Sequence, residues 1–234
     1  IAEQSTEETR GRVYCIAEGL FAVVGVVGPP IGGYLSQQFG FRAMFAVAAA
    51  LYVSATVIRL FMARNARRAE THVRPKPSLS NLKTSLMAMA GLVTAGGIVT
   101  WIMISDGARD VSFSMSYQLE PLFMHNVGGM SNLQIGWLAS MASLMTMLLM
   151  TPAGWLSDKK GERVGIVAGF ALVVVGLALF VNSRAFAGFA AVWIMFGVAE
   201  ALISPAYNSL ISKAVPTKLR GTAFGLFSTS IGFF

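Results

Sequence analysis

The side chains best suited to chemistry in this sequence are ionisable groups set inside long apolar stretches. Glu200 lies near the middle of the apolar stretch 187–211. An ionisable group at that depth of a membrane helix is costly and is a functional candidate. At helical spacing its face also carries Trp193, Gly197, Ser204 and Asn208. We expect Glu200 either to bind and release protons near neutral pH or to stay protonated in a structural hydrogen bond.

A second group of charges lies on one face of the stretch 86–117. Asp106, Arg109 and Asp110 stand at positions i, i+3 and i+4, and Phe113 and Tyr117 continue the same face. Opposite charges at this spacing reduce each other's cost of burial. Two depths remain open, because residues 86–104 alone can span a bilayer. The cluster either lines a cavity and binds substrate or protons, or lies at the outer interface with Arg109 reaching toward water.

Other kinds of chemistry have little support in the sequence. Cys15 is the single cysteine, so no internal disulfide forms, and His72 and His125 lie far apart. The stretch 19–33 lacks the lysine and hydroxyl spacing of a nucleotide-binding loop. We therefore expect no metal, no cofactor and no enzyme activity, and we expect an ion gradient to supply the energy.

The elements that must position these groups are membrane helices. Of the 234 residues, 55% are apolar and 12% are charged, a composition that does not suit a water-soluble enzyme. Backbone groups inside a bilayer must be satisfied within their own segment. The long apolar stretches therefore predict an all-α, polytopic membrane helix bundle, with helices over 13–35, 41–62, 86–117, 133–156, 164–181 and 187–211 and a shorter stretch at 221–234.

The net charge of +7 follows from membrane topology. Most Lys and Arg residues fall in alternate loops, and the opposite side holds only Arg42 and Arg184. The positive-inside rule places the basic loops in the cytoplasm of a cell with a plasma (inner) membrane. These loops are 1–12, 64–85, 157–163 and 213–220. Nucleic-acid binding is not needed to explain the charge.

Two glycine-containing motifs lie at helix ends. In 154–163, Gly154 allows close helix approach, Gly161 allows a tight turn, and Asp158 is placed to meet basic groups when the cytoplasmic side closes, with the charged neighbours Lys159 and Arg163. The second motif, 25–33, offers a smooth helix face bent by proline and contains Gly25, Gly28, Pro29, Gly32 and Gly33. For both motifs the plainer alternative is a solvated loop or simple close packing.

Internal repeats accompany these motifs. Residues 10–16 align with 220–226, and 33–42 align with 154–163 on the opposite membrane face. Repeats of inverted orientation are typical of secondary transporters.

The whole chain resembles the major facilitator superfamily, from its fifth to its eleventh helix. The best-matched motif is 154–163, similar to the family's cytoplasmic loop pattern. The motif 25–33 is similar to a signature of its proton-coupled exporters, although Val24 stands where that signature has a glycine. The resemblance implies that 1–63 are the last two helices of the N-terminal half, 64–85 a cytoplasmic central loop, and 86–234 helices seven to eleven of the C-terminal half, the last one truncated.

This resemblance implies a secondary active transporter that moves a small organic solute by alternating access, with H⁺-coupled export preferred. It also implies that the face carrying Glu200 lines a central cavity. We expect a monomer in a lipid bilayer and further helices outside this stretch, which alone would not transport. H⁺-coupled uptake of a nutrient or metabolite by the same fold is an alternative. A seven-helix receptor is another, without retinal because no lysine lies inside a span.

Overall fold

The computed structural model describes residues 7–69, 87, 91 and 98–214. Within these ranges it contains α1 (Glu7–Ala69), α3 (Ile98–Tyr117), α4 (Glu120–Asn126), α5 (Asn132–Lys160), α6 (Glu162–Asn182) and α7 (Phe186–Ala214). Most of the expected central loop 64–85 and the expected helix 221–234 lie outside the described residues. The described part of the chain is entirely helical apart from short turns, which confirms the predicted all-α class.

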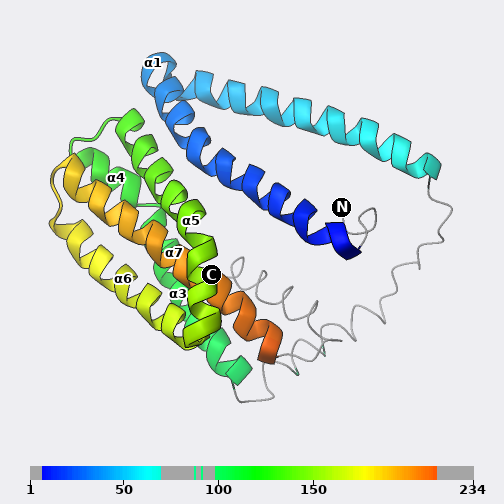
Figure 1. The fold of residues 1–234 in the computed structure, drawn as a ribbon. Helices are drawn as coiled ribbons and strands as arrows, with labels where there is room; N and C mark the ends of the chain where they lie inside the picture. Colours follow the sequence, from blue (N-terminus) through cyan, green and yellow to red (C-terminus); the bar gives the residue numbers. More distant parts are fainter. Residues whose placement is uncertain (1–6, 70–86, 88–90, 92–97, 215–234) are drawn as a thin grey trace.

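Four of these segments are long and apolar enough to cross a membrane, namely Ala22–Arg64, Asn132–Ser157, Glu162–Asn182 and Phe186–Leu210. The first contains two of the predicted helices. They meet at Gly40, whose φ of 79° and ψ of 165° are not helical. Glycine adopts this conformation at no steric cost. Figure 1 shows the two arms of α1 separating from that bend.

A bundle of three long helices forms the centre of the described structure. α5 packs against α7, α6 packs against α7, and the first arm of α1 packs against α5 (Figure 1). Close helix approach relies on small residues, as is usual inside membranes. At Gly169 of α6, a Cβ atom would lie only 2.4 Å from the Ile203 side chain of α7.

The buried apolar cluster lies at one end of this bundle and includes Met124, Leu138, Phe180, Phe189 and Val192. Met124 belongs to α4, a short helix in a region that we predicted as a loop. Pro121 favours its start because proline at the first helical turn loses no hydrogen bond. α5 then begins with a reciprocal cap in which the Ser131 hydroxyl accepts from the Gln134 N–H, and the Gln134 side chain accepts from the Ser131 N–H.

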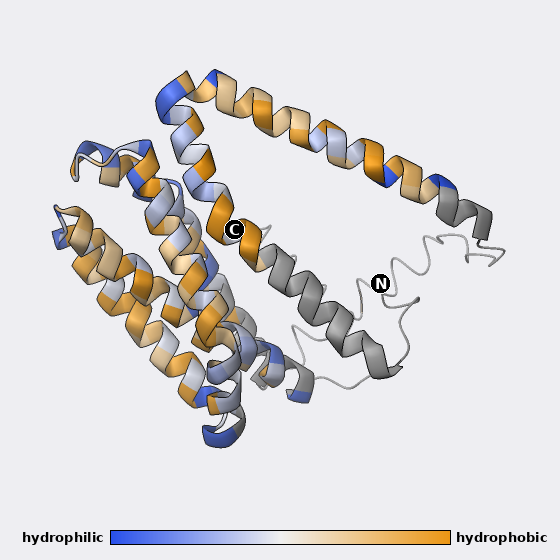
Figure 2. Ribbon diagram, turned by 45° about the horizontal axis from the view of Figure 1, so that its top comes forward, coloured by the Kyte–Doolittle hydropathy of each residue, from blue (hydrophilic) through white to orange (hydrophobic). Residues whose placement is uncertain are grey.

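Apolar side chains also cover the outside of the molecule. The second arm of α1 exposes 67% of Leu51, 78% of Tyr52 and 66% of Met62. Figure 2 shows this arm as largely hydrophobic along its length. Such surfaces suit contact with lipid or with other membrane helices rather than with water.

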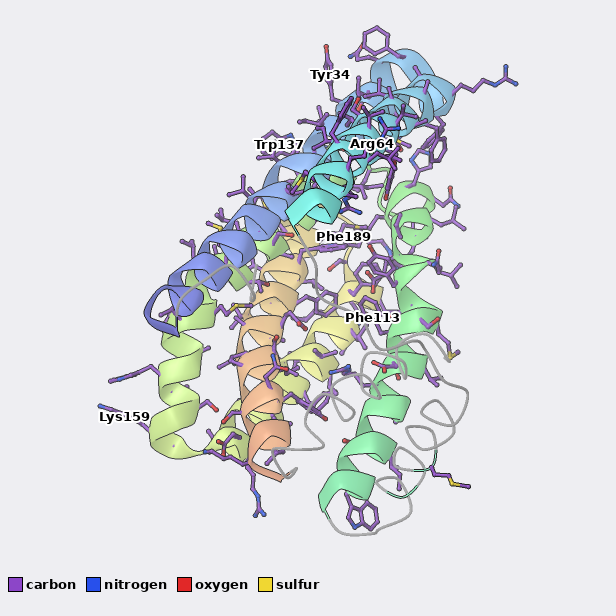
Figure 3. The ribbon with its side chains drawn as sticks, turned by 90° about the vertical axis from the view of Figure 1, so that its right-hand side faces the viewer. Tyr34, Arg64, Phe113, Trp137, Lys159 and Phe189 are labelled. Atoms are coloured by element: carbon purple, nitrogen blue, oxygen red, sulfur yellow. The ribbon has the colours of Figure 1, made fainter. Side chains whose placement is uncertain are left out.

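The helix ends fall into two groups (Figure 1). The bend at Gly40, α4 and the α6–α7 turn lie at one end of the bundle. The α5–α6 turn at Gly161 and the end of α7 lie at the other, where Lys159 extends outward (Figure 3). Loops that the sequence assigns to opposite membrane faces thus lie at opposite ends.

Candidate functional site

The predicted polar face of α7 is divided in the structure. Gly197 is buried against α5, where a Cβ atom would lie 2.3 Å from the Ala142 carbonyl oxygen. The Thr146 hydroxyl of α5 also donates to the Gly197 carbonyl oxygen at 3.0 Å. Gly197 therefore makes a helix contact and does not line an open space.

The other members of this face differ in exposure. Trp193 is part-buried beside the apolar cluster, and its indole N–H donates to the Met124 sulfur at 3.4 Å. Ser204 is part-buried, whereas Glu200 and Asn208 are exposed. The Glu200 carboxyl group thus projects from the described helices, inside an apolar span that runs from Phe186 to Leu210.

Arg109 and Asp110 form an ion pair on α3. Nε and Nη2 of Arg109 donate to Oδ1 of Asp110 at 3.1 and 2.9 Å. Asp110 is only 8% exposed, and within the described part of the chain its Oδ2 atom has no hydrogen-bond donor. A buried carboxylate oxygen in this state is an open acceptor for a proton or a cationic group. The side chain of Asp106 lies outside the described residues.

The same face of α3 continues with two aromatic rings. Phe113 and Tyr117 stack with ring centroids 4.9 Å apart, and both are exposed. Figure 3 shows Phe113 projecting from α3 on the side of the helical bundle. Both rings are therefore accessible to lipid, to another helix or to a solute.

The ion pair lies beside α7. The Ser105 hydroxyl lies 3.2 Å from the Tyr207 hydroxyl, and the Arg109 guanidinium lies 5.6 Å from the centre of the Tyr207 ring. Tyr207 belongs to the candidate span Phe186–Leu210. Arg109 therefore contacts a helix that is long and apolar enough to cross a membrane.

The motif 154–163 contains the end of α5, a break at Gly161 and the start of α6, so most of the expected loop is helical. Gly161 has a φ of 88°, and its N–H donates to the Ser157 carbonyl oxygen at 2.8 Å. Gly154 faces Pro205 of α7, to which a Cβ atom would lie 3.9 Å away. Lys159 lies 3.9 Å above the Trp155 ring. Arg163 is exposed, and the side chain of Asp158 lies outside the described residues.

Sequence reasoning missed two carboxyl groups. Glu162, next to the loop motif, accepts from the Ser209 hydroxyl at 2.8 Å and pairs with Lys213, which ties α6 to the end of α7. Glu120 of α4 is buried, and desolvation raises the pKa of its carboxyl group while a hydrogen bond with Ser116 opposes the rise. The apolar surroundings of Glu120 arise from tertiary packing, which no local pattern reveals.

The motif 25–33 packs α1 against α5. A Cβ atom at Gly33 would lie 2.5 Å from the Asn132 carbonyl oxygen, and one at Gly136 of α5 would lie 2.4 Å from the Pro29 carbonyl oxygen. At Gly25 the nearest atom would be the Ser143 hydroxyl, 3.3 Å away. Reciprocal glycines thus bring the two backbones together.

Two members of the motif do not touch α5 through this face. A Cβ atom at Gly28 would meet nothing within 4 Å, and one at Gly32 would meet only the Met44 sulfur of the other arm of α1, at 4.0 Å. The close approach therefore depends on Gly25 and Gly33 rather than on every glycine of the motif.

Hydrogen bonds also join α1 to α5 at this contact. Pro30 has no N–H, so the carbonyl oxygen of Val26 lacks its usual helical donor. The Ser140 hydroxyl of α5 donates to that oxygen. Nearby, the Leu133 N–H donates to the Gln37 side-chain oxygen at 3.3 Å.

Comparison with known proteins identifies the chain's family. A model of the major facilitator superfamily matches residues 1–234. The chain belongs to this superfamily.

Three curated superfamily relatives are similar along most of the chain. An uncharacterised MFS-type transporter of Methanocaldococcus jannaschii is 26% identical over 88% of this chain and 51% of its own length. A multidrug resistance efflux pump of Lactococcus lactis, named as a PmrA homolog, is 25% identical over 92% and 52%. The human synaptic vesicular amine transporter is 26% identical over 74% and 31%. The chain spans about half the length of the first two relatives.

Proposed function

We propose that the complete protein is a secondary active transporter that exports a small organic solute in exchange for H⁺. Superfamily membership supports transport, since all three relatives are named as transporters or as a pump. The efflux pump and the amine transporter favour a drug-like or amine-like organic solute. The motif 25–33 of α1 favours export over uptake.

Alternating access requires two bundles that move against each other around a central site. The α1–α5 contact supports this mechanism, because it combines closely fitting backbones with few side-chain hydrogen bonds. Within the described side chains, which on α1 are residues 22–64, no ion pair joins α1 to α5. This part of the contact can separate without breaking one. The arrangement of the loops supports basic loops on the cytoplasmic side of a plasma membrane. We expect the protein to act as a monomer.

The observation that carries the proton-coupling proposal is the position of Glu200. Its carboxyl group is exposed from the described helices yet belongs to an apolar span. Glu200 and Tyr207 are seven residues apart, which places them on nearly the same side of α7, two turns apart. Glu200 therefore lies on the side of α7 that meets α3 and its ion pair. A carboxyl group there exchanges its proton against the solute.

The test uses the complete protein in inverted membrane vesicles with an acidified lumen and the fluorescent organic cation ethidium as the probe. The unmodified protein should accumulate ethidium until the pH gradient is collapsed. Glu200→Gln should abolish this accumulation, while Glu200→Asp, which keeps an ionisable group, should retain part of it. Unchanged gradient-driven accumulation in Glu200→Gln would remove Glu200 from the mechanism. Accumulation only in right-side-out vesicles with an acidic exterior would indicate uptake.

The charged cluster on α3, Asp106, Arg109 and Asp110, needs a separate variant. Asp106→Asn combined with Asp110→Asn should reduce gradient-driven transport while leaving the protein folded. Loss of the folded protein instead would show that the cluster is structural, with Arg109 dependent on its carboxylate partner.

A further inference from the structure

Tyr207 joins three helices through one side chain. It is 7% exposed, and its hydroxyl lies 3.2 Å from the Ser105 hydroxyl of α3. The face of its ring lies 5.6 Å from the Arg109 guanidinium of α3. The ring also packs edge-on against Phe170 of α6, with centroids 6.3 Å apart.

Arg109 contacts residues on two helices. Its guanidinium donates twice to Asp110 on its own helix and lies over the Tyr207 ring of α7. The attraction between a cation and an aromatic face grows when water is excluded. The orientation of the ion pair relative to α7 therefore depends on the Tyr207 ring.

The register of the two helices places this pair near Glu200 in depth. α3 and α7 run in opposite directions (Figure 1). Counting from the Ser105–Tyr207 contact at 1.5 Å per residue, Asp110 lies about 7 Å along α3 and Glu200 about 10 Å along α7 in the same direction. Other charges near α7, Glu162 of α6 and Lys213, pair with each other near its far end.

We propose that Tyr207 is a positioning residue that holds Arg109, and with it the Arg109–Asp110 pair, against α7 close to the depth of Glu200. This inference rests on the proposed proton-coupled function. Without the aromatic ring, Arg109 loses this contact with α7 and moves relative to both carboxyl groups. The proton affinity of the site then changes, although both carboxyl groups and Arg109 are still present.

The test measures the pH dependence of ethidium transport by the complete protein. Tyr207→Phe keeps the ring and should retain the pH midpoint. Tyr207→Leu removes the ring and should move that midpoint by about half a pH unit or more, a threefold change in proton affinity. Phe170→Leu is the matched control, since it removes a ring contact of Tyr207 without touching α3.

Two further variants separate positioning from folding. Arg109→Lys keeps the charge but loses the planar double contact, and it should shift the midpoint in the same direction as Tyr207→Leu. It also provides the test if Tyr207→Leu fails to fold. In an Arg109→Gln background, Tyr207→Leu should cause no additional shift.

The outcomes are distinct. A midpoint that stays constant in both Tyr207→Leu and Arg109→Lys would overturn the inference and leave the proposed function intact. An equal shift in Phe170→Leu would also overturn it, because general loosening of the helix packing would then suffice. If transport by the unmodified protein does not depend on pH, the proposed function fails and this inference fails with it.

Discussion

The contact between α1 and α5 should tolerate no side chain at two of its glycines. A Cβ atom at Gly33 or Gly136 would lie within 2.5 Å of a backbone carbonyl oxygen, whereas one at Gly28 would meet nothing within 4 Å. Alanine is favoured over glycine inside a helix by about 1 kcal/mol. At Gly28 this gain is reduced, because a Cβ atom there would crowd the ring of Pro29. Overpacking at the closed positions costs about 1–3 kcal/mol. The difference between the variants is therefore a lower limit to the steric cost.

The assay compares apparent melting temperatures of the complete protein carrying Gly28→Ala, Gly33→Ala or Gly136→Ala. Since 1 kcal/mol corresponds to about 2–4 °C for 150–250 residues and to less in a longer protein, Gly33→Ala and Gly136→Ala should melt at least about 1 °C below Gly28→Ala. Equal melting temperatures for the three variants would refute the reasoning. That result would mean that the two helices do not approach each other this closely.

Two other predictions concern single groups. Ser140→Ala should destabilise the protein by about 0.5–1.5 kcal/mol. The effect should be smaller in a Pro30→Ala background, because the N–H of an alanine at this position can donate to the Val26 carbonyl oxygen. A double-mutant cycle of melting temperatures that shows no coupling between the two positions would contradict this. Because burial raises the pKa of the Glu120 carboxyl group, its contribution to stability should be complete below about pH 4.5 and be lost as the pH rises through the raised pKa. Between pH 4 and 8, the melting temperature of Glu120→Gln should fall less than that of the unmodified protein. Parallel curves of melting temperature against pH for the two proteins would disprove the role of Glu120.

Local patterns were sufficient for the long described helices and the breaks between them, but they did not predict α4. Hydrophobic length separated 13–35 from 41–62, and the structure bends at Gly40 between them. Patterns could not determine what each small residue faces. Gly197 shares a helical face with Glu200, yet it packs against α5 while Glu200 stays exposed. The position of the neighbouring helix α5 decides which of the two residues is covered. The sequence of α7 alone does not give that position.

The partners of polar groups were beyond sequence reasoning for a similar reason. Proline at position 30 predicts an unsatisfied carbonyl at Val26, but Ser140 lies 114 residues away along the chain. Likewise, the apolar length of 86–117 left the depth of Arg109 open. The contact with Tyr207 gives the register of α3 against α7, which the sequence of neither helix contains.

The most direct test of the central proposal is to measure protons released when the complete, detergent-solubilised protein binds ethidium in weakly buffered solution containing a pH indicator. If Glu200 exchanges its proton against the solute, the unmodified protein should release about one proton for each ethidium bound. Glu200→Gln should bind ethidium and release none. Equal proton release by the two proteins would contradict the account.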